Sequence, residues 1–303
     1  GDDYDTILGT NTFYSPYPGI GDDILRSAAP RDLIRANWMG YSKTGDALSD
    51  AAWRMVMKEM NSVWFWMWTG IGSWRGYLNP ALDFWPATAD LTEEMRPVRE
   101  GLGDLLMRSE VTHSGIGIFY SVPSALSGRV ENSREFNGPE NAHLTWTRLI
   151  YENGHDFRYL TSGMLKQGSL DKGGFKVLIL PMAQPIAPEE AAAIRRFVQA
   201  GGTIIADVRP GIYDGHCKPV LPGALDDLFG IQRTGRGKGV RGDIALKGRL
   251  GEQAIDVTLR DTIRDPEVEP AGAEVMARAE DGSPLLLVNR AGAGRAILLN
   301  FQM

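Results

Sequence analysis

The sequence predicts an α/β protein built on a parallel β-sheet, and one stretch carries most of that prediction. Residues 175–208 are FKVLILPMAQPIAPEEAAAIRRFVQAGGTIIADV. The apolar run 177–180 predicts a strand that is covered on both faces, and residues 203–208 predict a second one. Between them, Pro188 opens a helix whose apolar residues recur at helical spacing, and Gly201 ends it. A strand, a helix and a strand with short joints form a right-handed βαβ unit in a parallel sheet.

Length and composition narrow the class of protein. The 303 residues suggest two domains or one large domain, and 43% apolar with 23% charged residues is typical of a globular protein. The net charge of -6 gives no support for a nucleic-acid or anionic-membrane partner. No apolar run approaches the roughly 20 residues that span a bilayer. The sequence begins with Gly1 and shows no signal peptide, so we expect a fragment of a longer protein and leave its compartment open.

Cysteine and histidine positions predict neither a metal nor a cofactor. The single cysteine, Cys217, excludes an internal disulfide framework and a multi-thiolate metal site. The histidines are scattered without the spacing of metal ligands; they are His113, His143, His155 and His216.

The first region, up to about residue 110, is rich in tryptophan, glycine and proline and alternates between predicted strands and helices. Strands are predicted over residues 6–13, 32–39 and 63–68, and helices over 50–60 and 92–108, the last interrupted by Pro97. The strand at 63–68 (VWFWMW) is continuous and aromatic, so we expect it to be buried. Alternation would put Trp64, Trp66 and Trp68 on one of its faces.

The second region begins at Ser114. Strands are predicted over residues 115–120 and 156–160, and helices over 141–151 and 225–229, around the βαβ unit described above. This order is that of a flavodoxin-like or glutamine-amidotransferase-like sheet. The connection at 121–141 is predicted to be a long loop. From residue 231 the pattern changes to alternating strands over 243–246, 254–259, 274–279, 284–289 and 295–301, the last two forming a hairpin.

Two further motifs are weak. A glutamine-amidotransferase triad needs a cysteine on a strained turn after a central strand, but PMAQP follows Leu180 and Cys217 lies in a predicted loop. Residues 235–242 (GRGKGVRG) contain glycines and basic residues that suit a phosphate. No predicted strand precedes them and no helix follows, so a flexible loop is the preferred interpretation.

Sugar binding is the function that the aromatic strand suggests. A tryptophan exposed at the carboxyl end of a strand offers a platform for the apolar face of a sugar ring, and Trp68 is the best candidate because it is last in the strand. Packing in the core remains the alternative for each tryptophan. Asp83, Asp90 and Asp104 would suit sugar hydroxyls, although solvated loop and helix positions explain them equally well.

Longer stretches resemble a known family. Residues 40–86 (GYSKTGDALSDAAWRMVMKEMNSVWFWMWTGIGSWRGYLNPALDFWP) resemble the end of the (β/α)8 barrel in beta-galactosidases of glycoside hydrolase family 42 and their relatives. GIGIFYSVPSA, HLTWTRLIYENGHDFRYL and the stretch from Phe175 to Asp214 are similar to that family's middle domain. That domain is known as the beta-galactosidase trimerisation domain and has a class I glutamine-amidotransferase-like fold. GAGRAILLNF resembles its last strand.

The resemblance implies a domain organisation and a site. Residues 1–111 would be the C-terminal part of a (β/α)8 barrel. Residues 112–303 would be the trimerisation domain, with a β-rich portion from about residue 231. In the family an aromatic barrel strand ends in a tryptophan of the sugar site, so the implied substrate-binding residues are Trp68, Trp74, Arg75 and Asn79.

The family's chemistry requires two glutamates about 5 Å apart, at the ends of the fourth and seventh barrel strands, because these enzymes retain configuration. If residues 63–68 form the eighth strand, then residues 32–39 form the seventh. The segment from the start of that seventh strand to Tyr41 contains no glutamate. The only glutamate before residue 90 is Glu59, inside a predicted helix. A barrel takes about 250 residues, so the fourth strand would precede Gly1. Either the nucleophile is lost in this branch, or the strand register differs.

The function implied by the resemblance is a fragment of a retaining, beta-galactosidase-like glycoside hydrolase that acts on galactosides or related glycans and assembles as a homotrimer. No catalytic residue is assigned, and the chain alone is expected to be inactive. The alternative is a non-catalytic oligomerisation module with a decayed sugar site. An independent amidotransferase-like enzyme is the weakest interpretation, because the nucleophile is missing.

Overall fold

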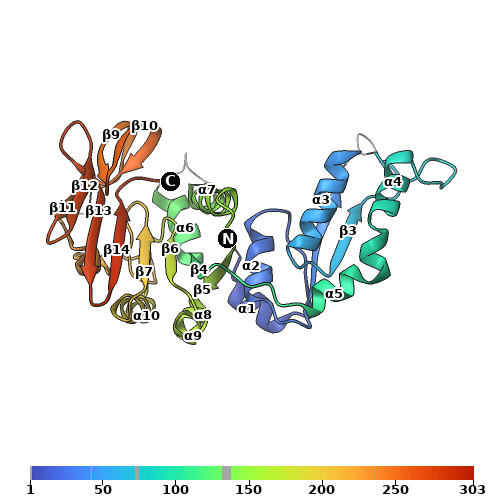
Figure 1. The fold of residues 1–303 in the computed structure, drawn as a ribbon, viewed down its shortest axis with the longest axis horizontal. Coiled ribbons are helices and arrows are strands. Elements are labelled where there is room, and N and C mark those ends of the chain that lie inside the picture. Colours follow the sequence, from blue (N-terminus) through green and yellow to red (C-terminus); the bar gives the residue numbers. More distant parts are fainter. Residues whose placement is uncertain (1, 42, 72–74, 132–137, 236) are drawn as a thin grey trace. The chain divides into compact units, whose positions relative to one another are not determined.

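The computed structural model describes residues 2–41, 43–71, 75–131, 138–235 and 237–303. The chain divides into two compact units (Figure 1). The smaller unit is Tyr4–Thr112, and the larger unit comprises Gly1–Asp3 with His113–Met303. No helix in the described ranges is both long enough and apolar enough to cross a membrane.

The described residues of the smaller unit form a three-stranded parallel sheet with the order β1-β2-β3. Its strands are β1 (Phe13–Tyr14), β2 (Ile34–Gly40) and β3 (Ser62–Trp66). Helices alternate with these strands: α1 (Tyr4–Thr10), α2 (Ile20–Ala28), α3 (Asp46–Met57), α4 (Pro86–Glu94), the segment η1 (Val98–Leu102) and α5 (Gly103–Arg108). The interruption expected at Pro97 lies between α4 and η1, since proline removes a backbone donor and clashes with the preceding turn.

Two predictions for this unit are wrong. Residues 6–13 were expected to be a strand, but most of them lie in α1, whose Tyr4 and Leu8 are buried at helical spacing. β3 was expected to be buried, yet Trp64, Phe65 and Trp66 are each about 40% exposed. Among the described strands β3 pairs with β2 alone, so it lies at the edge of the sheet and lacks a neighbouring strand whose side chains would help to cover its rings.

The larger unit contains a nine-stranded mixed sheet with the order β10-β9-β12-β13-β14-β7-β6-β4-β5. Its parallel half consists of β4 (Ile116–Tyr120), β5 (Phe157–Thr161), β6 (Val177–Leu180), β7 (Thr203–Ala206) and β14 (Gly294–Leu299). The order β5-β4-β6-β7-β14 is the flavodoxin-like order 2-1-3-4-5. The antiparallel half adds β9 (Val240–Leu250), β10 (Gln253–Arg264), β12 (Glu274–Arg278) and β13 (Pro284–Ala291). This confirms the predicted α/β class with a flavodoxin-like parallel sheet.

Helices pack against the parallel half of the sheet. They are α6 (Val122–Glu131), α7 (Gly138–Glu152), α8 (Ser162–Lys166), α9 (Ser169–Lys172), α10 (Pro188–Gln199) and α11 (Asp226–Phe229). In α10, Pro188 occupies a first-turn position, and the side chain of Glu190 accepts a hydrogen bond from Ala187 N at 2.8 Å. That bond satisfies a backbone donor at the start of the helix, which explains why α10 begins where the sequence predicts.

The structure adds elements that the sequence did not predict. Residues 121–141 were expected to be a loop, but α6 occupies Val122–Glu131 and α7 begins at Gly138. Ser124 N donates to Ser121 Oγ, so a serine cap supports the start of α6. Two short strands, β8 (Ile231–Arg233) and β11 (Val268–Pro270), form a separate two-stranded sheet. The expected hairpin is present, with Ala291 paired to Gly294 at its closing turn.

Candidate functional site

Aromatic side chains gather at the carboxyl edge of the small parallel sheet. The rings of Tyr17, which follows β1, and Tyr41, which follows β2, have centroids 6.2 Å apart. Tyr41 N donates to the carbonyl oxygen of Trp66, the last residue of β3, at 2.9 Å. Burial, with the hydrogen bond to Tyr17, raises the pKa of Tyr41 to about 12. The phenol therefore stays neutral at physiological pH.

One face of the sheet carries a row of stacked and edge-on rings. Trp38 of β2 meets Trp64 at 5.3 Å and Trp66 at 6.3 Å, both edge to face. Phe13 of β1 stacks on Trp64 at 4.8 Å. Phe65 contacts Tyr77 instead, at 5.4 Å. Trp64 and Trp66 thus share the face that carries Trp38, which is the arrangement that strand alternation predicts for these two residues.

Trp68 does not continue that row, because β3 ends at Trp66. Its side chain is 61% exposed, and its ring lies nearly parallel to that of Phe84, with centroids 6.4 Å apart and an interplanar angle of 18°. One face of the Trp68 indole is therefore supported by Phe84. A large, exposed aromatic surface remains in the loop that follows the sheet.

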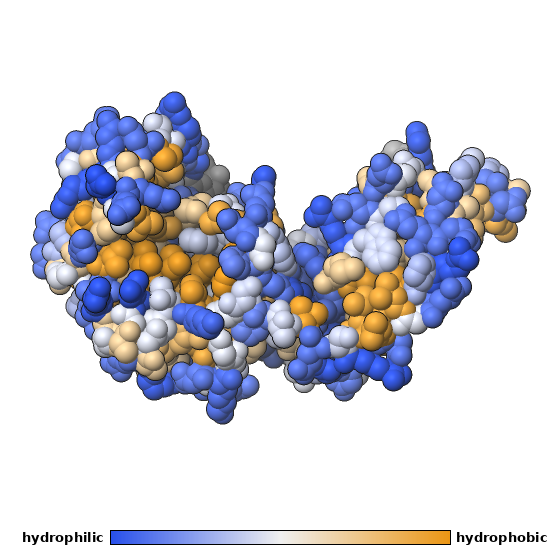
Figure 2. Space-filling view, in the orientation of Figure 1, coloured by the Kyte–Doolittle hydropathy of each residue, from blue (hydrophilic) through white to orange (hydrophobic). Residues whose placement is uncertain are grey.

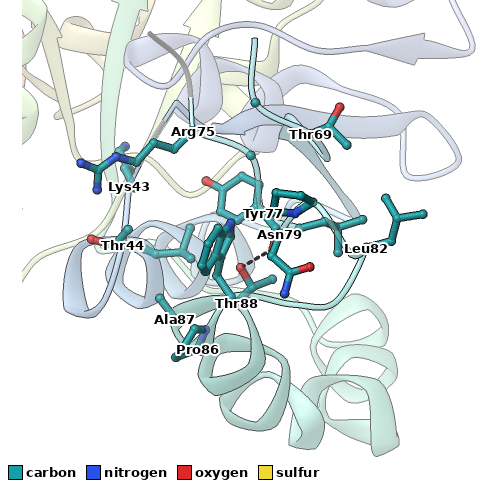
Figure 3. A pocket seen from close by; sticks show the side chains of 16 residues that line it. Lys43, Thr44, Thr69, Arg75, Tyr77, Asn79, Leu82, Pro86, Ala87 and Thr88 are labelled. Atoms are coloured by element: carbon teal, nitrogen blue, oxygen red, sulfur yellow. Dashed lines mark hydrogen bonds between the residues drawn. The ribbon is translucent and has the colours of Figure 1, made fainter. Parts of the chain in front are cut away.

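A cavity of about 720 Å³ lies in this loop region (Figure 3). Its walls are mostly apolar, and residues from the segments 43–48, 69–70 and 75–88 line it; those labelled in Figure 3 are Lys43, Thr44, Thr69, Arg75, Tyr77, Asn79, Leu82, Pro86, Ala87 and Thr88. Thr88 Oγ1 donates to the Tyr77 carbonyl oxygen at 3.1 Å, which ties the start of α4 to the loop. Burial raises the pKa of Tyr77, so its phenol is also neutral.

The structure brings two of the four predicted site residues to this cavity. Arg75 and Asn79 line it, whereas Trp68 lies just before it in the chain and Trp74 lies outside the described residues. Asn79 Oδ1 accepts hydrogen bonds from Ala81 N at 2.8 Å and Asp83 N at 3.0 Å. The side-chain carbonyl of Asn79 is thus used to shape the turn.

The sequence did not predict the other polar residues of the cavity. Lys43 and Thr44 follow β2 and reach the same cavity as Arg75, although more than 30 positions separate them in the chain. No local sequence pattern links Lys43 and Thr44 to Arg75. The one available signal is that Lys43 and Thr44 lie in the short β2–α3 connection, at the carboxyl edge of the sheet where sites commonly form. Among the described residues that line the cavity, two are basic and none is acidic.

The buried carboxylates of this unit lie on the other side of the sheet. Trp38 points to the aromatic face, so its neighbour Asn37 points to the opposite face. There, Asn37 Nδ2 donates to Asp22 Oδ1. Asp23 is 3.0 Å from both Lys58 Nζ and Arg26 Nε. Burial raises the pKa of Asp22 to about 6, partly offset by Lys58. The cluster joins α2 to β2, which is a structural role.

The carboxylates considered in the sequence analysis do not supply an acid and base pair at the aromatic edge. Glu59 lies between α3 and β3, next to the amino end of β3, whereas barrel enzymes react at the carboxyl ends of their strands. Asp104 of α5 accepts from Arg108 Nε at 2.9 Å along the helix, and the backbone of Asp83 belongs to the Asn79 turn.

The turn that follows β6 in the larger unit carries no nucleophile of the kind that an amidotransferase triad needs. Met182, two residues after β6, has a left-handed backbone with a φ of 40°, and its N–H donates to Asp207 Oδ1. A buried methionine in this position cannot attack a substrate. Cys217 is an exposed residue; partial desolvation of its sulfur and the nearby Asp214 carboxylate raise the pKa of its thiol. Within the described part of the chain, no group of three or more His, Cys, Asp or Glu residues is arranged to hold a metal ion.

Comparisons with known proteins show one family match and several similar folds. Residues 165–303 match the family model of the beta-galactosidase trimerisation domain. The beta-galactosidase from Rahnella sp. R3 superposes with a TM-score of 0.81 at 17% identity, over 99% of this chain and 49% of that one. The beta-galactosidase Gan42B of G. stearothermophilus, a family 42 enzyme, gives 0.75 at 16% identity over 96% and 46%.

An exo-beta-1,4-mannosidase, Op5Man5 from Opitutaceae bacterium strain TAV5, gives a TM-score of 0.59 at 15% identity, over 95% of this chain and 54% of that one. No curated protein matches the sequence. By the shares given above, the chain spans about half the length of these solved structures. The resemblance inferred from the sequence is confirmed in this form: residues 165–303 match the model of the beta-galactosidase trimerisation domain, and the chain shares the fold of the glycoside hydrolase family 42 beta-galactosidases.

Proposed function

We propose that the chain is part of a beta-galactosidase-like glycoside hydrolase that acts on galactosides or related glycans, and that its larger unit serves assembly as a homotrimer. The fold match over 99% of the chain with a beta-galactosidase carries this proposal. The trimerisation-domain match of residues 165–303 supports the assembly role. In this proposal residues 1–111 are the C-terminal part of the catalytic barrel and residues 112–303 the trimerisation domain.

The sugar site in this proposal is formed by Trp68, Arg75 and Asn79, together with Trp74. The exposed indole of Trp68, backed by Phe84, offers an apolar surface for the C–H face of a sugar ring. The adjoining cavity of about 720 Å³ falls within the range that holds small-molecule ligands. Arg75 supplies donors for sugar hydroxyls at its rim.

Catalysis needs groups that this arrangement does not supply. A retaining glycosidase requires two carboxyl groups about 5 Å apart. Asp22 belongs to the cluster beneath the sheet, and Glu59 lies at the amino end of β3. In the proposal, Trp68, Arg75 and Asn79 bind and position the sugar, and the catalytic glutamates belong to other segments of the parent enzyme.

The second candidate function is a non-catalytic oligomerisation module with a decayed sugar site. The positions of Asp22 and Glu59 favour it for this stretch of chain. An assay with p-nitrophenyl galactosides is expected to show no turnover by the 303 residues alone. Turnover would mean that a carboxyl pair exists within them and that the strand register inferred from the sequence is wrong.

The substitution Trp68→Ala tests the sugar site. We expect lactose or galactose binding, measured by isothermal titration calorimetry, to weaken about fivefold, because an aromatic contact contributes about 1 kcal/mol. Tyr151→Ala is the control, since Tyr151 is an exposed aromatic residue of the larger unit. Equal affinities of the two variants would remove Trp68 from the site. No sugar binding by the unchanged chain would remove the site altogether.

A further inference from the structure

The two faces of the parallel sheet in the larger unit are covered differently. On one face, β6, β7 and β14 bury Leu178, Ile204, Ala296 and Leu298 completely. These side chains form a core with α8, α9, α10 and α11, which contribute Leu165, Leu170, Ile194, Phe197 and Leu228 among others. This face is a closed, fully packed layer.

A row of apolar residues crosses the opposite face. The strand registers align Tyr159, Ile118, Ile179, Ile205, Ile297 and Val288 from β5 through to β13. At the β5 end, the row lies under α7, because Tyr159 Oη is 3.3 Å from Nδ1 of His143. There, Tyr159, Ile118 and Ile179 are buried.

The other end of the row is only partly covered. Ile205, Ile297 and Val288 are half-buried, as is Leu299, which lies two residues beyond Ile297 on the same face. The residues that alternate with them, Ile204, Ala296 and Leu298, belong to the closed core. We call Ile205, Val288, Ile297 and Leu299 the open face. Both sides of β7 and β14 are thus apolar, whereas a sheet face in contact with water normally carries polar residues.

In the described part of the chain, the helices with the most extensive contacts to β7 and β14 are α10 and α11, both on the closed side. Figure 1 accordingly shows no helix in front of these strands, and Figure 2 shows a continuous hydrophobic band over the same region. The band extends toward the β9–β10 hairpin, where Ile255 and Leu259 are half-buried and Val257 is 50% exposed. Ile297 and Leu299 pack against a buried cluster that includes Leu286 and Phe301, which covers part of the open face. The apolar surface that remains suits a partner, because parallel sheets normally have both faces covered.

We propose that the open face is the surface with which this chain docks onto a second copy of itself. The inference rests on the assembly role proposed above, and it names the surface. The open face lies wholly within residues 165–303, which match the trimerisation domain. Its row contains no charged residue, and the centres of subunit interfaces are depleted in charge. Three of its four members are β-branched and lose little rotamer freedom on docking.

The geometry of a trimer constrains the partner surface. Stable interfaces bury about 800 Å² on each partner, so the open face is the centre of the contact and the β9–β10 hairpin extends it. Contacts in a threefold ring are heterologous. The open face therefore meets a different surface on the next copy.

The substitution Ile297→Lys tests the proposal by analytical ultracentrifugation. The unchanged chain is expected to sediment as a trimer at micromolar concentration, and the variant to associate at least about 100-fold more weakly, because its charge would be buried in the contact. Leu149→Lys is the matched control: Leu149 is an exposed leucine of α7, 42% accessible, and its substitution should leave the trimer intact. Circular dichroism checks that both variants fold.

A milder variant keeps the test valid if Ile297→Lys does not fold. Ile297→Cys, in a chain that also carries Cys217→Ser, is labelled with a maleimide at high and at low protein concentration. Labelling is expected to be at least tenfold slower in the concentrated, assembled sample. A trimer that persists with Ile297→Lys, or equal labelling rates at both concentrations, overturns the docking surface alone. A chain that stays monomeric at every concentration overturns the proposed assembly role as well.

Discussion

Two buried ionisable side chains of the larger unit have pKa values shifted in opposite directions. Asp207 is fully buried, and burial raises its pKa to about 7, although Met182 N and Trp146 Nε1 donate to its carboxylate. His143 lies one turn before Trp146 in α7, and burial lowers its pKa to about 3. Each group therefore remains neutral in the folded protein over most of the acidic range.

These shifts have opposite consequences for stability. Asp207 binds its proton more tightly when folded, so its contribution is complete below pH 3.8 and is lost as the pH rises through about 7. His143 binds its proton more weakly when folded, so its contribution is complete above pH 6.5 and is lost as the pH falls toward 3. Between about pH 4 and 6.5 the folded state holds one proton on Asp207 and the unfolded state holds one on His143. The two effects cancel in that window.

Single substitutions should expose each effect. Relative to the unchanged chain, Asp207→Asn is expected to gain stability as the pH rises from 4.5 to 6.5, by up to about 1.4 kcal/mol per pH unit, because only the His143 effect remains. His143→Gln is expected to lose stability over the same range, because only the Asp207 effect remains. Urea denaturation at several pH values measures both slopes. Variants whose stability runs parallel to that of the unchanged chain would contradict the assignment.

At the scale of the element, the joint between β2 and the following loop determines how the aromatic edge is built. Gly40 ends β2 with a φ of 107°, a backbone region that side chains rarely adopt. A Cβ at this position would lie 2.6 Å from Tyr77 Oη and closer still to the Trp66 carbonyl oxygen. Because Gly40 has no side chain, the end of β2 can lie directly against Trp66 at the end of β3 and against Tyr77, which lines the cavity.

Gly40→Ala is accordingly expected to destabilise the smaller unit by about 2–4 kcal/mol, through both backbone strain and overlap with fixed backbone atoms. Gly9→Ala in α1 is the control, because no atom lies within 4 Å of its added Cβ and alanine favours a helix. Chemical denaturation followed by tryptophan fluorescence measures both. A Gly40→Ala variant as stable as the control would show that the edge can relax around a methyl group.

The elements that the sequence predicted well are those fixed by local signals. β6, α10 and β7 were predicted because an apolar run, Pro188, a helical stripe and Gly201 all lie within 34 residues. α6 was missed because its serines, proline and single glycine resemble a loop composition, whereas the hydrogen bond from Ser124 N to Ser121 Oγ supports the start of the helix. Tertiary packing determines whether such a segment is a helix or a loop, and the periodicity of a single sequence does not reveal that packing.

The cavity shows the same limit at the site. Arg75 and Asn79 were found through a resemblance, while Lys43 and Thr44 were missed because they join the cavity only after β2 and β3 pair. The exposure of β3 was also unpredictable, since an apolar run does not state whether its strand is central or at an edge.

At the scale of the molecule, each unit contains a sheet and a buried core of its own. Seven of the eight tryptophans lie in Tyr4–Thr112, and Trp146 is the exception. Tryptophan fluorescence therefore reports mainly on the smaller unit, whereas far-ultraviolet circular dichroism reports on the secondary structure of both.

Units with separate cores are expected to unfold in separate transitions. The fluorescence transition should occur at one denaturant concentration, and the circular dichroism signal should show a second transition that belongs to the larger unit. Gly40→Ala should move the first transition and leave the second in place. Asp207→Asn should move only the second, with the pH dependence derived above. If both variants shift a single coincident transition, the two units fold as one cooperative body, and the division at Thr112 does not mark independent domains.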